Sequence, residues 1–374
     1  MVLRSSHSTA PVICSGRRDQ ALCPDMMDQP PVTVYGFSFS HHGQYSAFHR
    51  LLHYTRDCRV MDVTLPLQAF LRPAWRGRLE LRWLRWSEWR LRPVFARRER
   101  QRVHYIYPEN TLFRGGGWKG QHRLLLTCHQ PGNELRSMVR QDRYRGLLQG
   151  LREADRVVLL AAHTVDDYRE FCDPQRLVVI PHGVDVRFFE PASEKPRRPL
   201  ILTIGNWLRD YDFWSDVVLR LAHRMPDVEF AAVALPQVIE KTRSLVEPRL
   251  RGRVRFAHGL ADGQLKALYQ QAALLFLPLT DTVANNALLE SMASGVPAVV
   301  SDLPAAREYA GACGTFFKQG AMEDCLGQLT ELLRQPEKRS ALAVACRQRA
   351  VGQFSWEVIA ARYAGLYAEI LKEH

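Results

Sequence analysis

The 374-residue sequence contains no run of about 18 apolar residues, so no transmembrane helix is expected. Its first 30 residues lack the apolar core of a secretory signal, and we expect residues 1–30 to form a disordered tail. The eight cysteines are scattered, without a Cys-x-x-Cys pair or a metal-ligand spacing with histidine. We therefore expect unpaired thiols, a cytoplasmic protein and no metal site.

What the sequence does contain is typical of a globular protein of two ordinary domains, with 46% hydrophobic and 24% charged residues. Lysine and arginine number 51 against 39 acidic residues, which gives a formal net charge of +12. Such an excess favours a polyanionic partner, and the classes to weigh are nucleic acid, an anionic membrane surface and phosphorylated substrates.

Part of this excess is concentrated at residues 72–102, which hold eleven arginines interleaved with Trp75, Trp83, Trp86 and Trp89. Tryptophan and arginine together suit a membrane interface, and they also suit stacking on single-stranded nucleic acid. Leucines in the same segment show partial helical spacing, so a packed helix with a solvated basic face is the third interpretation. Of the two binding interpretations we favour peripheral contact with an anionic membrane over nucleic acid.

Short apolar runs alternate with amphipathic stretches along most of the chain. Strands are predicted at residues 32–37, 102–107, 123–127, 156–160, 177–180, 200–205, 228–234, 253–257, 273–277 and 298–300. Helices are predicted at about residues 45–54, 135–153, 262–271, 322–334, 337–350 and 356–371, with another beginning near 213. This order predicts an α/β protein with parallel sheets and crossover helices.

Residues 282–297 (TVANNALLESMASGVP) are the most informative segment, because a strand precedes this loop and short helix and another follows. The start of a helix offers unpaired N–H groups and partial positive charge to an anionic phosphate. Asn286 and Glu290 are four residues apart and share a helix face, so Glu290 can accept hydrogen bonds from both hydroxyls of a ribose. Gly295 can end the helix in the left-handed conformation. The alternative is an ordinary buried βαβ unit whose glutamate is solvated.

Two further segments, between the halves of the chain and at the start of the last helix, carry a resemblance to a known family. Residues 180–191 (IPHGVDVRFFEP) join the two halves of the chain, and residues 354–357 (FSWE) open the last helix. Together with residues 282–297 they resemble the retaining, nucleotide-sugar-dependent glycosyltransferases of family 4. The resemblance implies the GT-B architecture, in which two Rossmann-like doubly wound domains face a central cleft. It places the acceptor-side domain at residues 31–191, the donor-binding domain at 192–352, and a helix crossing back at 353–374.

The resemblance also implies roles for residues of the 282–297 segment. In the family a carboxylate at the position of Glu290 binds the ribose of the donor, and a second at the position of Thr282 contacts the transferred sugar. Thr282 therefore departs from the pattern at a catalytic position. The family's central glycine is replaced by Asn285, which tolerates positive φ better than other non-glycine residues.

For the donor diphosphate, the family uses an arginine directly after a strand-ending glycine and a lysine six residues later. The glycine is Gly205, but Asn206 and Asp212 occupy the two cationic positions. We expect Arg209 to bind the phosphates instead, because a guanidinium can bind phosphate oxygens bidentately. The alternative is a surface arginine paired with Asp210 or Asp212.

On the acceptor side, residues 125–132 (LLTCHQPG) resemble the family's segment in which a histidine lies against the transferred sugar, which implies a catalytic role for His129. The alternative for His129 is a structural cap of the strand. Gly43, in the loop at residues 40–46 (SHHGQYS), falls where the family approaches the donor phosphate. We expect the nearby histidines at positions 41, 42, 49 and 53 to be surface residues and not metal ligands.

The sequence thus predicts a metal-independent glycosyltransferase with no cofactor beyond its nucleotide-sugar co-substrate. It would move a sugar from a UDP- or GDP-sugar to a saccharide or lipid-linked acceptor. The alternatives are a sugar-nucleotide epimerase or phosphorylase on the same fold, and a non-catalytic nucleotide-sugar-binding protein. The departures at Thr282, Asn206 and Asp212 motivate the last of these.

Overall fold

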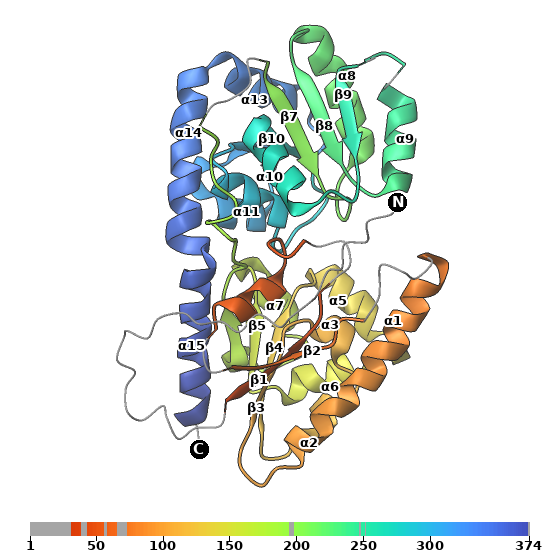
Figure 1. Ribbon diagram of the computed structural model, residues 1–374, viewed down its shortest axis with the longest axis vertical. Coiled ribbons are helices and arrows are strands. Elements are labelled where there is room, and N and C mark those ends of the chain that lie inside the picture. The colour runs from red at the N-terminus through yellow and green to blue at the C-terminus, as the bar shows by residue number, and fades with distance from the viewer. Residues whose placement is uncertain are drawn as a thin grey trace, which may run out of the picture. The chain divides into compact units, whose positions relative to one another are not determined.

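The computed structural model describes residues 31–38, 43–55, 58–65, 73–193, 198–246, 248–250 and 252–372. The expected tail at residues 1–30, His41 and His42, and the side chain of Trp75 lie outside this description. The part described holds two parallel sheets (Figure 1), so the predicted pair of Rossmann-like doubly wound α/β units is confirmed.

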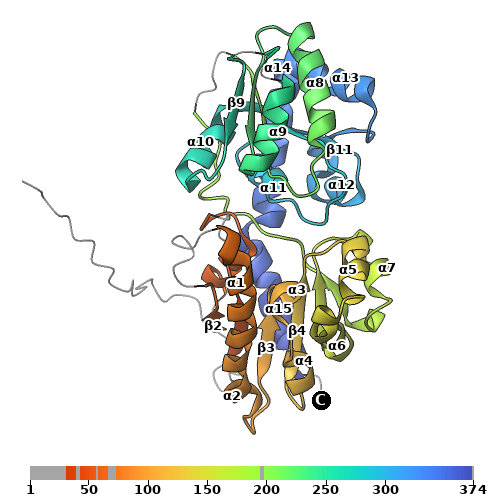
Figure 2. The ribbon, with the colours of Figure 1, turned by 90° about the vertical axis from the view of Figure 1, so that its right-hand side faces the viewer.

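The first sheet of the described chain has six parallel strands in the order β2-β1-β3-β4-β5-β6. They are β1 (Val32–Gly36), β2 (Cys58–Asp62), β3 (Arg102–Tyr105), β4 (Arg123–Cys128), β5 (Arg156–Leu159) and β6 (Leu177–Val179). The accompanying helices are α1 (Pro73–Ser87), α2 (Arg92–Phe95), α3 (Pro108–Thr111), α4 (Gly115–Trp118), α5 (Gly132–Val139), α6 (Arg145–Glu153) and α7 (Val165–Tyr168). Figure 2 shows α1 at one edge of this sheet and α5, α6 and α7 toward the other.

The second sheet, again counted over the described residues, has the order β12-β11-β10-β7-β8-β9. Its strands are β7 (Leu200–Ile204), β8 (Glu229–Val233), β9 (Val254–Ala257), β10 (Ala272–Leu277), β11 (Ala298–Ser301) and β12 (Thr315–Phe317). Its helices are α8 (Tyr211–Arg224), α9 (Pro236–Val246), α10 (Asp262–Gln271), α11 (Asn286–Ala293), α12 (Pro304–Ala310), α13 (Met322–Arg334) and α14 (Pro336–Arg349).

The central strands are continuous apolar runs because helices cover both faces of a parallel sheet. Leu124, Leu125 and Leu126 of β4 are all fully buried, and Leu274 and Leu275 of β10 are fully buried too. Burying such side chains stabilises each domain by about 1.5–3 kcal/mol per residue relative to leaving them exposed.

The last helix, α15 (Trp356–Lys372), follows α14 along one side of the molecule (Figure 1). It packs on the first sheet through buried polar contacts. The Tyr367 hydroxyl is hydrogen-bonded to His104 Nδ1 at 2.7 Å, and the Tyr363 hydroxyl to Thr127 Oγ1 at 3.0 Å. None of the described helices is both long and apolar enough to cross a bilayer.

Two predicted helices differ in the structure, and two strands were not predicted. The helix expected at residues 45–54 is a 3-10 helix, Phe48–His53. The helix expected at 135–153 is interrupted, because Gln141 adopts an extended conformation (φ −97°, ψ 133°) between α5 and α6. The edge strands β2 and β12 have no counterpart in the sequence-based assignment.

Candidate functional site

The start of α11 is built around Asn285, whose side chain accepts a hydrogen bond from the Leu288 N–H at 3.2 Å. Asn285 is therefore the N-cap of α11, and its side chain accepts a backbone N–H of the first turn that has no acceptor within the helix. Asn285 has a φ of −126°, so this cap is extended and does not use the tolerance of asparagine for positive φ. Gly295 does end this segment with a positive φ of 62°, as predicted.

Glu290 lies one turn into α11 and is 4% exposed. The Tyr269 hydroxyl of α10 donates to its Oε2 at 2.8 Å. Burial raises the pKa of Glu290 to about 8, although the hydroxyls of Tyr269 and Ser46 act in the opposite direction. The solvated-glutamate alternative is therefore excluded, and the carboxyl changes its charge near neutral pH.

Arg209 lies in the loop after β7, where Gly205 has a φ of 97° and Leu208 one of 58°. Its guanidinium donates to the Ile204 carbonyl through Nε at 3.2 Å and to Asn285 Oδ1 through Nη2 at 3.1 Å. A Cβ at Gly205 would lie 3.0 Å from the same Nη2, so glycine leaves room for the arginine. The cation is thereby held against the start of α11.

The alternative in which Arg209 pairs with a neighbouring aspartate is not what the structure shows. Asp210 caps α8 by accepting from the Phe213 N–H at 2.9 Å, and Asp212 pairs with Lys241 at 2.7 Å. Burial lowers the pKa of Arg209. A partly buried guanidinium held only by uncharged oxygens is an attractive position for an anion.

The metal-independent prediction also assumed that the chain contains no Asp-x-Asp motif, which is wrong, because Asp210-Tyr211-Asp212 has the spacing that many metal-dependent transferases use. Both carboxylates are engaged as a helix cap and an ion pair. Across the described ranges, no three His, Cys, Asp or Glu side chains gather as metal ligands would.

Thr282 is buried, 5% exposed, in the loop between β10 and α11. The backbone N–H of Thr282 donates a hydrogen bond to Oδ1 of the preceding Asp281 at 2.7 Å. A carboxylate thus occurs one residue before the position where the family has one, and it is turned toward its own loop. Asp281 was not singled out from the sequence, because the motif spacing points to residue 282.

The loop after β1 meets the second sheet's helices. Asn286 donates through Nδ2 to the Ser46 carbonyl at 2.7 Å, and the Gln44 N–H donates to Asp262 Oδ2 at 3.0 Å. A Cβ at Gly43 would lie 1.5 Å from the Asp262 carboxylate, so this approach requires glycine. Gly43 is therefore brought next to α10 and near the segment that carries Glu290.

His129 follows β4, and its Nε2 is hydrogen-bonded to the Ile106 carbonyl at 2.8 Å. Its ring stacks on Tyr107, with centroids 4.5 Å apart, and meets Phe48 edge-on at 5.0 Å. Burial lowers its pKa to about 3, so the ring is neutral. Nε2 is used within the fold, and a contact with a sugar must come from another atom of this residue.

Glu109 of α3 is a site residue that sequence reasoning missed. It is 4% exposed, and its Oε1 accepts the N–H of His129. Burial raises its pKa to about 7. Nothing in the local sequence distinguishes this glutamate, because its contact with His129 joins residues 20 positions apart. Tyr269 and Ser46 escaped notice for the same reason.

The Arg/Trp segment forms α1, the 3-10 helix Glu88–Leu91 and α2. One side is packed as the structural interpretation predicts: Leu84 and Leu91 are 4% and 0% exposed. The other side is exposed, with Trp86 at 59% and Trp89 at 43%. The segment is thus both a packed helix and an aromatic, basic surface.

Comparison with known proteins places this geometry in context. Residues 198–335 match the family model described as glycosyl transferases group 1. The MMP alpha-(1->4)-mannosyltransferase of Mycolicibacterium hassiacum is 28% identical over 204 residues, which make up 53% of this chain and 49% of that protein. The GDP-mannose:cellobiosyl-diphosphopolyprenol alpha-mannosyltransferase of Xanthomonas oryzae pv. oryzae is 22% identical over 223 residues, 58% of this chain and 59% of that protein.

These alignments span about half the length of the curated relatives. Solved structures extend the likeness in fold over most of the chain. Sucrose-phosphate synthase from Thermosynechococcus elongatus has a TM-score of 0.71 and 17% identity, covering 92% of this chain and all of that one. Anabaena HepE in complex with UDP-glucose has a TM-score of 0.69 and 14% identity, covering 90% of this chain and 99% of that one. The second half of the chain is thus similar in sequence to glycosyl transferases group 1, and most of the chain has the GT-B fold of these solved structures.

Proposed function

We propose that the protein transfers a hexose from a UDP- or GDP-sugar to a saccharide or lipid-linked acceptor, with retention at the anomeric carbon and without a metal. The observation that carries the proposal is the juxtaposition of Arg209, Asn285 and Glu290 at the start of α11. All three lie within the residues that match the glycosyl transferases group 1 model.

Each of these side chains meets a chemical requirement of sugar transfer. When the bond between the anomeric carbon and the phosphate oxygen breaks, the departing diphosphate gains negative charge. Arg209 and the first turn of α11 supply positive charge there without reorganisation. Glu290 accepts hydrogen bonds from the ribose hydroxyls, and the acceptor hydroxyl passes its proton to the departing phosphate as the new glycosidic bond forms.

The sugar itself would lie between the loop that carries Thr282 and the end of β4 that carries His129. Thr282 offers a hydroxyl where related enzymes have a carboxylate, so we propose that it orients a sugar hydroxyl by hydrogen bonding. His129, held neutral by burial, would orient the sugar without exchanging a proton. Gly43 lets the loop after β1 close against α10 on the donor side.

The names of related proteins support the donor class. Mannosyltransferases, one of which uses GDP-mannose and a diphosphopolyprenol-linked acceptor, are among the relatives. HepE has been solved with UDP-glucose. A nucleoside diphosphate sugar is named for two of these proteins, and the Arg209–Asn285 arrangement fits its diphosphate.

We also propose that the protein works in the cytoplasm against an anionic membrane surface, which would deliver a lipid-linked acceptor. In the Arg/Trp segment, Leu79, Trp86 and Trp89 are 38%, 59% and 43% exposed, and Arg82 and Arg90 are exposed as well. Tryptophan rings sit at headgroup depth, and basic residues near an anionic surface contribute about 1 kcal/mol each.

Turnover tests the transferase proposal. Purified protein should release UDP or GDP from a nucleotide sugar, slowly with water and faster with a saccharide acceptor. Glu290→Gln should lower the rate at subsaturating donor, whereas Glu337→Gln, at an exposed position of α14, should not. Absence of nucleotide release from every UDP- and GDP-sugar, with and without acceptors, would contradict an enzyme.

A non-catalytic nucleotide-sugar-binding protein is the second candidate. Thr282 supplies no carboxylate, and Asn206, whose Oδ1 accepts the Leu235 N–H at 3.1 Å, supplies no positive charge. Asp212 pairs with Lys241. Tight nucleotide-sugar binding without turnover over a panel of acceptors would favour this candidate.

A further inference from the structure

Glu290, the carboxyl proposed to bind the ribose, is covered in this structure. Its side chain is 4% exposed, and the Tyr269 hydroxyl already donates to its Oε2 at 2.8 Å. The Ser46 hydroxyl lies close enough to oppose the rise in the pKa of this carboxyl. A ribose hydroxyl must come within about 3 Å of a carboxylate oxygen to donate a hydrogen bond. The residues that cover Glu290 must therefore move before a nucleotide can bind there.

The cover comes from the loop after β1, and we call residues 43–46 the gate. Asn286 Nδ2 donates to the Ser46 carbonyl at 2.7 Å, and the Gln44 N–H donates to Asp262 Oδ2 at 3.0 Å. Asp262 is the first residue of α10, and Asn286 is the first residue of α11. The gate thus lies on the N-terminal ends of two helices of the second sheet, where the donor nucleotide would be held.

A stack of aromatic rings fixes the gate. The Tyr45 ring lies parallel to the Phe188 ring, with centroids 3.8 Å apart and an interplanar angle of 2°. A cation lies over each ring: the Arg50 guanidinium is 4.8 Å from the Tyr45 centroid, and Lys266 Nζ is 5.4 Å from that of Phe188. Stacked rings and cations over ring faces both attract. We call these four side chains the latch.

The latch is anchored in three parts of the chain. Arg50, in the 3-10 helix after the gate, pairs with Asp185 at 2.8 Å, and Asp185 is 2% exposed. Lys266 of α10 pairs with Glu190 at 2.8 Å. Phe188 lies in the segment that joins the two halves of the chain. The latch therefore connects the gate to this joining segment and to a helix of the second sheet, outside the donor-binding residues.

We propose that the gate is an autoinhibitory cover of the donor site, held shut by the latch, and that a nucleotide binds only after the gate has moved off Glu290. The inference rests on the proposed function, in which Glu290 binds the ribose. A covered site reduces the apparent affinity for a nucleotide in proportion to the fraction of open molecules. Weakening the latch raises this fraction, so the affinity should rise.

Stopped-flow and calorimetric titrations of the full chain with UDP and GDP test the gate. Phe188→Ala and Tyr45→Ala each remove one ring of the stack. Because an aromatic pair contributes beyond its buried area, each variant should raise the nucleotide affinity and the association rate constant by about two- to tenfold. Lys266→Gln, which removes one cation and keeps both rings, should give a smaller rise in the same direction. Thermal melts establish that each variant is folded.

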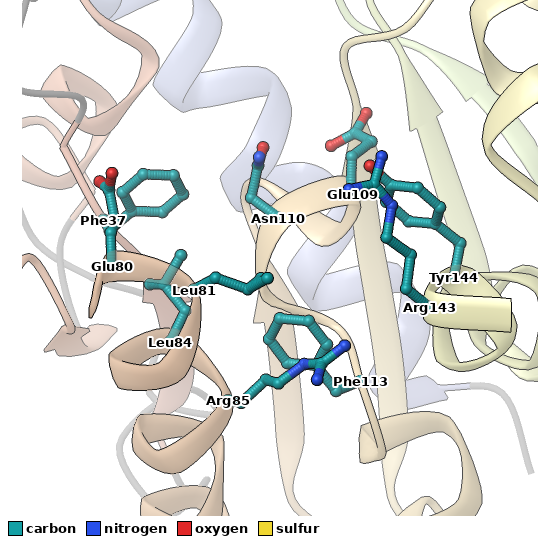
Figure 3. A pocket seen from close by; sticks show the side chains of 10 residues that line it. All are labelled: Phe37, Glu80, Leu81, Leu84, Arg85, Glu109, Asn110, Phe113, Arg143 and Tyr144. Atoms are coloured by element: carbon teal, nitrogen blue, oxygen red, sulfur yellow. The ribbon is translucent and has the colours of Figure 1, made fainter. Parts of the chain in front are cut away.

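Tyr144→Ala is the matched control. Tyr144 is also a partly buried tyrosine with a guanidinium over its ring, that of Arg143 at 4.7 Å. It lines a cavity of about 220 Å³ that is bounded by residues of α1 and α3 (Figure 3). Tyr144→Ala should leave the nucleotide affinity and the association rate constant at their wild-type values.

The sign of the change decides between a cover and a binding element. Latch variants that bind the nucleotide no more tightly than wild type would overturn the inference, as would an equal gain in Tyr144→Ala. A gain confined to slower dissociation would also overturn it, because the latch would then act on the bound state. Failure of the proposed function looks different: neither wild type nor any latch variant would bind UDP or GDP.

Discussion

At the scale of single residues, Glu290 combines deep burial with an ionisable group. Its pKa is raised from 4.5 to about 8 in the folded protein. Between these values the folded protein keeps a proton that the unfolded chain has lost. The stability contributed by this group is therefore lost as the pH rises through that window.

Replacing Glu290 by glutamine removes this titration. The free energy of unfolding of Glu290→Gln should rise relative to wild type by up to about 1.4 kcal/mol for each pH unit across the window. Denaturant melts at several pH values measure it. Wild-type and variant curves that stay parallel would mean that the carboxyl titrates as an exposed group.

Arg209 should distinguish the diphosphate from the rest of the nucleotide. Arg209→Gln should lower the affinity for a nucleoside diphosphate by about 1.5–3 kcal/mol and that for the nucleoside hardly at all. Because the side chain is partly buried, the gap should persist at high salt. Calorimetric titrations measure both, with Arg249→Gln, at an exposed position, as the control. Equal losses for the two ligands would mean that Arg209 acts through packing.

The limits of sequence reasoning are clearest at this scale. Glu290 and Arg209 were identified because a motif and a missing cation pointed to them. The contact between Arg209 and Asn285 joins residues 76 positions apart, and no local pattern encodes it. Glu109 was missed because burial, and not residue type, makes it unusual.

At the scale of elements, α1 and the turn after it depend on one buried carboxylate. Glu88 is fully buried, and its Oε1 accepts the backbone N–H groups of Phe113, Arg114 and Gly115 at 2.9–3.0 Å. The Tyr105 hydroxyl also points to it, at 3.3 Å. The Arg/Trp segment is thereby fixed to the loop that leads into α4.

Glu88→Ala leaves these donors without their acceptor and should cost about 3–5 kcal/mol of stability. Glu88→Gln keeps a carbonyl oxygen at the same place and should cost less. Thermal and denaturant melts measure both. A Glu88→Ala protein as stable as wild type would mean that water replaces the carboxylate at no cost.

The exposed side of the Arg/Trp segment should determine membrane contact. Trp86→Ala/Trp89→Ala should lower binding to anionic vesicles and leave nucleotide binding intact, because Trp86 is 59% exposed and Trp89 is 43% exposed. Trp83→Ala is the matched comparison, since Trp83 Nε1 donates to the Val63 carbonyl at 2.9 Å and supports packing. It should lower stability more than the double variant does. Co-sedimentation with anionic and neutral vesicles decides, and equal binding to both would contradict a membrane role.

Element prediction succeeded where apolar runs are long and buried. The strands β4 and β10 are of this kind. It failed at β2, a sheet-edge strand whose side chains are half-buried or exposed and whose sequence Cys-Arg-Val-Met-Asp lacks an apolar run. The α/β fold class was nevertheless predicted correctly, because the parallel crossover topology depends on the central strands.

At the scale of the whole molecule, several contacts connect the segments of the two sheets, among them Asn286 with Ser46, Gln44 with Asp262, and the Tyr309 hydroxyl with the Leu160 carbonyl at 2.7 Å. The parallel sheets follow from the sequence pattern and are confirmed by the structure. Donor base, sugar and acceptor depend instead on the contacts of a few individual side chains, which no local sequence pattern encodes. A single binding measurement therefore bears most directly on the central claim.

That measurement is a calorimetric titration of wild type, Glu290→Gln and Glu337→Gln with UDP and GDP near pH 8. The account predicts that wild type and Glu337→Gln bind one of these nucleotides equally well. Glu290→Gln should lose about 1.5–3 kcal/mol of that affinity, because an amide replaces the charged acceptor of two ribose hydroxyls. Identical affinities of Glu290→Gln and wild type, or no binding of either nucleotide to wild type, would contradict it.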